Sequence, residues 1–553
     1  MSYLPSPIPL CILYNKCTNN KQGNMGAAAA GKWSKPVSQY NLKNKSKKKL
    51  KSLLMRRSVI LLLLLLLQLG VLVGTAVYLS QAQFYLYVLL HLVSLLVVFV
   101  ILMKKDNPSY KLGWIIPIMA VPLVGGLFYL VVGDKRIGRA MKKRIDAYAR
   151  ILERKQYKRG GYIEELRRQN PMQARQVEYI YSISKAALQT NTRVKYFPCG
   201  ELAFDEMITQ LRQAQRFIML EYFIIEEGLM WDTILEILEE KQGQGVEIRI
   251  LYDDAGCFKT LPLGYDQTLR EKGFQVVVFN PVQPLLNTVT NYRDHRKICV
   301  IDGNTGFTGG INLADEYINE VERFGHWKDT VVMLQGDGVW NLTEMFLQLW
   351  QFSSGEEMEA QQFRPTCSYP RDGYVQAFGD SPLDALNVAE NAYMQIINHA
   401  QRYVYITTPY LILDNEMMTA LTIAAQSGID VRIMTPHVPD KWYVHPVTRS
   451  YYLGLLEAGV RIFEYTPGFV HAKMFVSDDT TAIVGTTNMD YRSFYLHFEC
   501  GVAFYNASVV LDVKEDFLKS QEICQEITLE EERQVNPLRR LGRSLLRLFA
   551  PLM

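Results

Sequence analysis

The stretch HRKICVIDGNTGFTGGIN, residues 295–312, recurs later in the chain as HAKMFVSDDTTAIVGTTN, residues 471–488. In both copies a His is followed by a Lys two residues on, an Asp five residues after the Lys, and an Asn at the end. Side chains two residues apart in a β-strand lie on the same face, so each His and its Lys would point toward one pocket. The repeat therefore predicts a duplicated fold with two chemical half-sites.

Each stretch has the pattern of a β-hairpin, because turn-forming Asp, Gly or Asn residues separate two apolar runs. If the first stretch folds back between Gly303 and Asn304, Asn312 lies opposite His295. The same reflection in the second copy sets Asn488 opposite the His of that copy. One hairpin would thus gather a base, a cation and an amide.

The repeated positions are the candidate site residues. The candidates for catalysis are His295, Lys297, Asp302, His471, Lys473 and Asp478, and the candidates for binding a substrate phosphate are Asn312 and Asn488. The two Asp residues stand at an odd spacing from their His, so we expect them to face away from the substrate and brace the hairpin. A single His-x-Lys pair on an apolar strand would indicate only a surface or core pair, but two copies in register favour a functional site.

Both stretches resemble the HKD signature of the phospholipase D superfamily. In that family the two copies meet at one active site and act on phosphodiesters, so the resemblance implies one site shared by two motifs. Members commonly carry the nucleophile in the N-terminal motif, which implies His295 as the attacking residue and His471 as the acid to the departing alcohol. Glu499 and Asp329, which follow the second and the first motif, match acidic positions of the family.

A phosphodiester places its own demands on such a site. Its anionic oxygens repel nucleophiles, so the site must supply positive charge and hydrogen-bond donors that fit the transition state. The two lysines and two asparagines can do this without a metal. An imidazole titrates near neutral pH, so one His can attack while the other serves as an acid, which splits one displacement into two. An acidic residue bonded to imidazole, the role we expect for Glu499 and Asp329, would fix the tautomer.

The repeat continues outside the two motifs and indicates the fold class. AQRFI at residues 214–218 matches AQRYV at 400–404, and GVEIRI at 245–250 matches GIDVRI at 428–433. Strands that alternate with helices in both copies predict an α/β fold with mixed sheets flanked by helices. We therefore expect two duplicated phospholipase D-like lobes, preceded by N-terminal transmembrane helices, with the site between the lobes.

Changes in composition along the chain predict its division into segments. The predicted segments are a disordered basic leader (1–57), a membrane anchor (58–133), a juxtamembrane connector (134–185), the first lobe (186–350), a linker (351–374), the second lobe (375–535) and a basic amphipathic tail (536–553).

Three apolar runs, at residues 59–79, 84–103 and 112–132, precede the lobes, and each is close to the roughly 20 residues that cross a bilayer. They indicate a multi-pass protein of the cell membrane. Lysines before the first run favour a cytoplasmic N-terminus. Basic residues flank both sides of the third run, so that run either crosses and exposes the catalytic part outside, or bends back and leaves it in the cytoplasm, which we favour. A cleaved signal peptide is disfavoured because no clean A-x-A site closes the first run.

The net charge and the cysteine pattern bear on three classes of partner, namely nucleic acids, metals and cofactors. The formal net charge of +4 gives no global argument for nucleic acid. The eight cysteines form no C-x-x-C pair and have no His at a spacing suited to zinc, so we expect no structural metal and no cofactor. Cys299 shares strand parity with His295, which makes a nucleophilic thiol conceivable, but a packing role is favoured.

From about residue 84 onward the chain resembles the bacterial cardiolipin synthases of the phospholipase D type, with WIIP at 114–117, LEY at 220–222 and TTPY at 407–410. The resemblance implies transfer of a phosphatidyl group between two phosphatidylglycerol molecules in the membrane, giving cardiolipin and glycerol without ATP. A membrane-bound phospholipase D hydrolase or another phosphatidyltransferase would use the same residues. A nuclease would share them too, but the three apolar runs argue against it. A scaffold without activity is disfavoured by two intact motifs.

The last segment, residues 536–553, alternates arginines with leucines in a basic amphipathic pattern. This pattern predicts a helix lying on the membrane surface. The alternative is a helix docked on the second lobe.

Overall fold

The computed structural model describes residues 84–104, 107–120, 161–282, 291–384 and 386–552, with isolated residues between 66 and 145. The predicted leader at 1–57 and most of the apolar run at 59–79 lie outside the described residues.

The first sheet is mixed and has seven strands in the order β1-β9-β7-β6-β2-β3-β4. The strands β2, β3 and β4 run parallel, as expected where helices connect them, and the other neighbours pair antiparallel. The strands are β1 (Thr192–Phe197), β2 (Phe217–Tyr222), β3 (Glu247–Asp253), β4 (Gln275–Phe279), β6 (Lys297–Ile301), β7 (Thr305–Gly309) and β9 (Val331–Gly336).

The second sheet repeats this order as β10-β17-β16-β15-β11-β12-β13 and adds β18 at its edge. Each strand of the first sheet therefore has a counterpart in the second, and the predicted α/β class with mixed sheets is confirmed. The strands are β10 (Tyr374–Asp380), β11 (Tyr403–Thr407), β12 (Asp430–Pro436), β13 (Arg461–Tyr465), β15 (Met474–Ser477), β16 (Thr481–Gly485), β17 (His497–Tyr505) and β18 (Cys524–Ile527).

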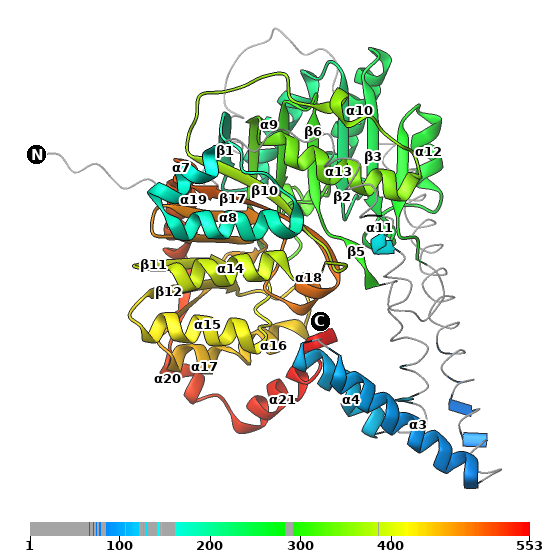
Figure 1. The fold of residues 1–553 in the computed structure, drawn as a ribbon, viewed down its shortest axis with the longest axis vertical. Coiled ribbons are helices and arrows are strands. Elements are labelled where there is room, and N and C mark those ends of the chain that lie inside the picture. Colours follow the sequence, from blue (N-terminus) through cyan, green and yellow to red (C-terminus); the bar gives the residue numbers. More distant parts are fainter. Residues whose placement is uncertain are drawn as a thin grey trace, which may run out of the picture.

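Helices cover the outer face of each sheet, and two further helices lie between the sheets (Figure 1). The outer helices are α9 (Gly200–Arg212), α10 (Leu229–Gly243) and α12 (Tyr265–Glu271) on the first sheet, and α8 (Pro171–Ser184), α14 (Val388–His399), α15 (Asn415–Gln426) and α17 (Tyr452–Glu457) on the second. Helices α13 (Val339–Ser354) and α19 (Val509–Gln521) contribute to the shared core between the sheets. Burial of each large apolar side chain there, such as Phe346, contributes about 1.5–3 kcal/mol.

Short elements complete the described chain. They are α7 (Tyr162–Gln169), α11 (Asp254–Cys257), α16 (Val444–Arg449), α18 (Tyr491–Tyr495), α20 (Leu529–Arg533), α21 (Pro537–Arg547), η2 (Asp315–Ile318), η3 (Ala360–Phe363), η4 (Ala550–Leu552), β5 (Arg293–Asp294), β8 (His326–Lys328) and β14 (Gly468–Val470). The helices α7 and α8 fall within the predicted connector, and α8 packs its apolar face into the core of the second sheet.

The turn of the first motif hairpin differs from the prediction by one residue. Ile301 pairs with Thr305, so the chain folds back around Gly303 rather than between Gly303 and Asn304. The reason is the turn geometry. Asp302 and Gly303 both adopt positive φ angles, of 56° and 71°, and Asn304 donates its backbone N–H to the Ile301 carbonyl at 3.0 Å.

This register overturns the expectation that Asn312 stands opposite His295. Continued past the paired strands, the reflection would place Asn312 opposite Asp294 instead, and His295 lies before the start of β6. The second hairpin has the same three-residue turn, with Ser477 paired to Thr481, so its predicted register is also wrong by one residue.

The helices α3 (Phe84–Met103) and α4 (Pro108–Ala120) pack against each other, and α4 contacts η4 near the end of the chain (Figure 1). Asn107, between them, donates its side-chain amide to Asp414 at 3.1 Å and to Tyr495 at 2.9 Å, which ties this pair to the second lobe. Among the described residues, no helix is both long enough and apolar enough to cross a bilayer.

Candidate active site

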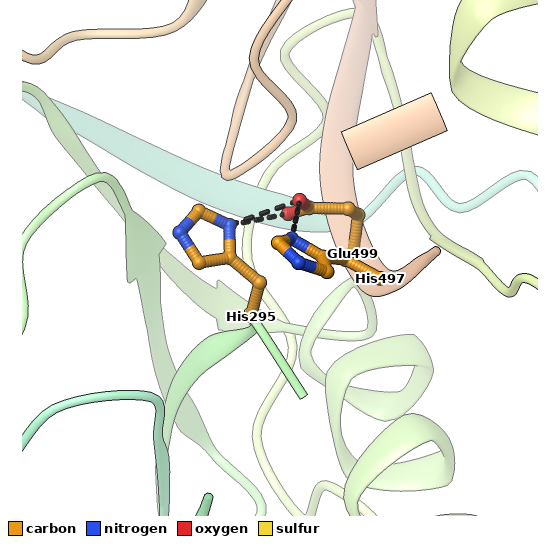
Figure 2. A group of neighbouring side chains, drawn as sticks. All are labelled: His295, His497 and Glu499. Atoms are coloured by element: carbon orange, nitrogen blue, oxygen red, sulfur yellow. Dashed lines mark hydrogen bonds and ion pairs between the residues drawn. The ribbon is translucent and has the colours of Figure 1, made fainter. Parts of the chain in front are cut away.

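Two short parallel ladders between the lobes position the catalytic histidines. In the first ladder, β5 pairs with β17 so that Asp294 stands beside Phe498. The backbone N–H of His295 then donates to the Phe498 carbonyl at 2.9 Å. This brings His295 level with Glu499, whose oxygens lie 2.9 and 3.0 Å from the imidazole Nδ1 (Figure 2).

The second ladder also joins the two lobes, but here the histidine comes from the second lobe and the carboxylate from the first. The strand β8 of the first lobe pairs with β14 of the second, with Lys328 beside Val470. The N–H of His471 donates to the Lys328 carbonyl at 2.7 Å. Consequently the Nδ1 of His471 lies 2.7 Å from Asp329 Oδ2. Each lobe therefore supplies the carboxylate for the histidine of the other lobe, and neither half-site is complete within one lobe.

The carboxylates determine which imidazole nitrogen carries the proton. Burial by itself raises the pKa of Glu499, but the charge and hydrogen bond of His295 hold this pKa well below its usual range. Burial is likewise outweighed at Asp329, where the charges of His471 and Lys473 lower the pKa. An ionised carboxylate can only accept a hydrogen bond, so Nδ1 of each imidazole is the protonated nitrogen and Nε2 keeps its lone pair.

Both imidazoles favour the neutral form in the ligand-free site. Burial lowers the pKa of His295 well below its usual value and lowers the pKa of His471 to about 4, although the carboxylates oppose this effect. A neutral imidazole with a free Nε2 is the nucleophilic form. An anionic phosphodiester beside the two rings would raise both pKa values and favour protonation of one ring, which the reaction needs as its acid.

The two lysines lie behind the histidines. The ammonium group of Lys297 donates to the carbonyl of His295 at 2.5 Å, and that of Lys473 donates to the carbonyl of His471. Burial lowers the pKa of Lys297 to about 8 and that of Lys473 to about 7. Each ammonium group has two further N–H donors besides the one used on the carbonyl, and a bound anion would favour the charged form of the lysine.

A cavity of ≈ 540 Å³ between the lobes joins the two half-sites. Its lining includes both histidines and both asparagines, whereas Lys297 and Lys473 are not among the described lining residues. Asn312 is held in place, because its Oδ1 accepts from the Ile224 N–H at 3.0 Å and its Nδ2 donates to the Tyr317 hydroxyl at 2.6 Å. The Oδ1 of Asn488 is buried and has no hydrogen-bond partner among the described residues.

The two motif aspartates lie away from the cavity, at the turns of their hairpins. The carboxylate of Asp302 accepts the backbone N–H groups of Gln215, Arg216 and Phe217 at 2.9, 2.7 and 3.0 Å. Asp478 accepts the corresponding three N–H groups, at 2.7 to 3.1 Å, at the start of β11. Their geometry is that of braces between the hairpin and the neighbouring parallel strand, and it offers no contact with a substrate in the cavity.

Cys299 is buried in the core of the first lobe and does not line the cavity. Burial raises the pKa of its thiol, which keeps the sulfur protonated and unreactive.

Two aromatic residues of the site were not predicted from the sequence. Trp327 packs against His471 with 5.3 Å between ring centroids, and His497 packs against His295 at 5.4 Å. Both line the cavity. Each stands two residues before a carboxylate of the site, and strand parity would have placed both on the cavity side.

The residues His295, His497 and Glu499 bring one possible ligand atom each within 4.8 Å of the others, which no other trio of the described residues does (Figure 2). Glu499 is already engaged, because it accepts hydrogen bonds from the His295 ring and from the Thr486 hydroxyl. The donor set is therefore explained by a hydrogen-bonded dyad, and the absence of a metal remains a prediction.

Comparison with known proteins relates this site to a family. A family model described as "Cardiolipin synthase, PLD-like domain" matches residues 207–350 and 393–520, and one described as "Phospholipase_D-nuclease N-terminal" matches residues 92–133. The chain is 35% identical over 469 residues to the cardiolipin synthase of Halalkalibacterium halodurans, covering 84% of this chain and 93% of that protein. It is 44% identical over 451 residues to an uncharacterized protein of Streptococcus mutans, covering 80% of this chain and 96% of that protein.

Among solved structures, the phosphatidylserine synthase of Haemophilus influenzae superimposes with a TM-score of 0.52 at 13% sequence identity. The match covers 69% of this chain and 100% of the phosphatidylserine synthase chain. At this identity the likeness concerns the fold alone.

Proposed function

This chain belongs to the cardiolipin synthases of the phospholipase D superfamily, and we propose that it transfers a phosphatidyl group through a covalent intermediate on His295. The enzyme is a phosphatidyltransferase, with phospholipids such as phosphatidylglycerol as substrates. The observation that carries the mechanism is the crossed pair of dyads, His295 with Glu499 and His471 with Asp329, opening on one cavity.

In the first step, Nε2 of His295 attacks the phosphorus of a phosphatidylglycerol. The bond between phosphorus and the headgroup glycerol oxygen breaks, and protonated His471 gives its proton to that oxygen. Glu499 stabilises the positive charge that develops on His295, as a buried carboxylate bonded to Nδ1 does in other nucleophile and base pairs. Glycerol leaves, and a phosphatidyl-histidine remains.

In the second step, neutral His471 takes the proton from a hydroxyl of a second phosphatidylglycerol. That oxygen attacks phosphorus, the bond between nitrogen and phosphorus breaks, and His295 is restored with cardiolipin as the product. One phosphodiester replaces another, so the exchange needs no ATP. Asn312 and Asn488 line the cavity and can stabilise the phosphoryl oxygens in both steps, while the two lysines behind the histidines supply positive charge to the site.

The same proposal includes a multi-pass attachment to the cell membrane with the catalytic lobes on the cytoplasmic side. Helix α3 supports the attachment, because it exposes large apolar side chains, including Leu92, Leu96 and Phe99. Exposed apolar patches of this kind are typical of surfaces that contact lipid or another apolar partner.

The C-terminal helix α21 supports the attachment independently, because it turns an arginine toward the protein and exposes leucines on its outer face. Arg543 faces the protein and pairs with Glu532 at 2.8 Å, and Arg547 lies over the ring of Tyr451 at 4.0 Å. Most leucines of the helix face outward, with Leu538 79% exposed and Leu541 56% exposed, while Leu546 packs against the second lobe. The helix therefore docks on the second lobe through Arg543, Arg547 and Leu546, and we propose that its exposed apolar face lies in the membrane surface.

The direct test supplies the purified full-length protein with phosphatidylglycerol in mixed micelles and separates the lipid products. Cardiolipin with equimolar glycerol is the expected result. Phosphatidic acid as the main product would instead identify a hydrolase, with water as the acceptor. The His471→Ala variant serves as the inactive control.

A further inference from the structure

Three cationic side chains outside the two motifs line the catalytic cavity, namely Arg323, Lys441 and Arg492. Two of them are already neutralised. Arg323 pairs with Glu316 at 2.8 Å. Lys441 pairs with Asp440 at 2.8 Å and also donates to the Tyr410 hydroxyl at 2.7 Å.

Arg492 differs from the other two. Within the described residues, its guanidinium forms no ion pair and no side-chain hydrogen bond, although it is half-buried at the cavity wall. The nearby carboxylate of Asp490 is used elsewhere, because it accepts the Ser493 N–H at 2.7 Å and caps α18. Asp490 interacts electrostatically with Arg492 but forms no ion pair with it among the described residues, so the planar donors of the guanidinium are still available to a phosphate.

The duplication shows that this charge is particular to one lobe. Arg492 stands four residues after Asn488, and Glu316 stands four residues after Asn312. The two lobes thus place opposite charges at corresponding positions, and the acidic one binds Arg323. At this position of the repeat, a cationic side chain is therefore present in the second lobe and an acidic one in the first.

His497 adds a second unsatisfied group to the same wall. It is 8% exposed and lines the cavity. Its Nδ1 contacts Glu499 at 3.6 Å (Figure 2), whereas its Nε2 has no hydrogen-bond partner among the described residues. Buried polar groups are nearly always bonded, so a group that is unbonded in the ligand-free protein points to a bound ligand.

We propose that Arg492 and His497 form a second phosphate subsite, which binds the phosphodiester of the acceptor lipid. The inference rests on the proposed function. In that reaction two phosphodiesters enter one cavity, and the motif residues serve the one that reacts. The phosphate of the acceptor keeps its negative charge throughout, so it needs a separate cationic partner in a buried site. This subsite would favour a phosphate-bearing alcohol over water or a simple alcohol.

The test compares two soluble acceptors with phosphatidylglycerol as the donor in mixed micelles. One acceptor is deacylated phosphatidylglycerol, which carries the phosphodiester, and the other is ethanol, which does not. Arg492→Gln should lower the ratio of kcat/KM for the phosphodiester acceptor to that for ethanol by about tenfold, the loss expected for one charge-assisted hydrogen bond. The loss should appear mainly in KM for the phosphodiester acceptor, and Arg492→Lys should restore part of it.

Matched variants sharpen the test. Arg323→Gln removes a cavity arginine that is already paired, and its acceptor ratio should equal that of the wild type. His497→Gln, which keeps a donor, should lower the ratio less than His497→Ala. An unchanged ratio in Arg492→Gln, or the same loss in Arg323→Gln, would overturn the subsite. A wild-type protein that forms phosphatidylethanol but no cardiolipin would refute the proposed function itself, and the subsite with it.

Discussion

Glu499 of the second lobe accepts the Nδ1–H of His295 from the first lobe, with both carboxylate oxygens within 3.0 Å. The pairing is produced by a two-residue parallel ladder that crosses between the lobes. Its counterpart joins Asp329 to His471 in the opposite sense. The active site therefore exists only when the two lobes are docked, and several measurable consequences follow from that arrangement.

Removing the negative charge of a dyad should impair chemistry without unfolding the protein. In Glu499→Gln the imidazole loses the partner that fixes its tautomer and stabilises its cation, and we expect kcat to fall by ~10²–10⁴. Asp329→Asn should give a similar loss. The measurement is cardiolipin formation, with thermal unfolding as the test of folding. Glu526→Gln, which alters an exposed partner of Arg461, is the control. Activity within threefold of wild type in Glu499→Gln would contradict the assigned role.

The two histidines should differ in their ability to form the covalent intermediate. His295→Ala should give no phosphoryl adduct, because its nucleophile is gone. His471→Ala should still form some adduct with a short-chain p-nitrophenyl phosphodiester, whose leaving group needs no proton. Acid quenching followed by mass spectrometry of the peptides measures the adduct. An adduct on His471 in the His295→Ala protein would reverse the two roles.

The motif aspartates should affect stability more than chemistry. Asp302→Ala removes the acceptor of three backbone N–H groups at the start of β2, and we expect the free energy of unfolding to fall by about 1–3 kcal/mol. Asp478→Ala should behave alike. Denaturant unfolding measures the loss, and kcat per folded molecule should stay within about tenfold of wild type. A fall in kcat as large as that of Glu499→Gln, with unchanged stability, would argue for a direct catalytic role.

Acidification should destabilise the ligand-free protein through His471. Its pKa is lowered from 6.5 to about 4 on folding, so the unfolded chain binds more protons between these values. Stability therefore falls as the pH drops from 6.5 toward 4. The lowered pKa values of Glu499 and Asp329 act in the same direction at the acidic end. Denaturant unfolding at about pH 7.5, above this window, and at about pH 5, within it, should show a smaller loss of stability in His471→Gln than in wild type. Equal pH dependence in both proteins would contradict the buried neutral imidazole.

The outer face of α21 should govern the response to lipid surfaces. The double variant Leu541→Gln and Leu545→Gln changes exposed positions, so its stability should stay close to that of wild type while its binding to vesicles weakens. Deleting residues 538–553 should reduce activity on vesicles more than on detergent-dispersed lipid. Vesicle flotation and parallel assays measure both effects. Equal loss on vesicles and micelles would count against a membrane contact.

The sequence by itself determined the features that depend on local periodicity. The spacing of His295 to Lys297, repeated at His471, identified the motifs, and the alternation of strands with helices gave the α/β class and the mixed sheets. Strand parity also gave the orientation of Asp302, because side chains one residue apart point to opposite faces whatever the rest of the fold does. The acidic positions Glu499 and Asp329 were predicted from the resemblance to the family, which did not state the histidine that each one pairs with.

Only the tertiary structure decided the relationships between lobes. Nothing in the order of residues states that Glu499 pairs with His295 rather than with His471, because the pairing depends on how β5 meets β17 across the interface. The one-residue error in the hairpin register arose from positive φ angles at the turn, which residue type favours without dictating. Arg492 forms no ion pair among the described residues, and this likewise depends on which carboxylates reach it, a property of packing over long sequence distances.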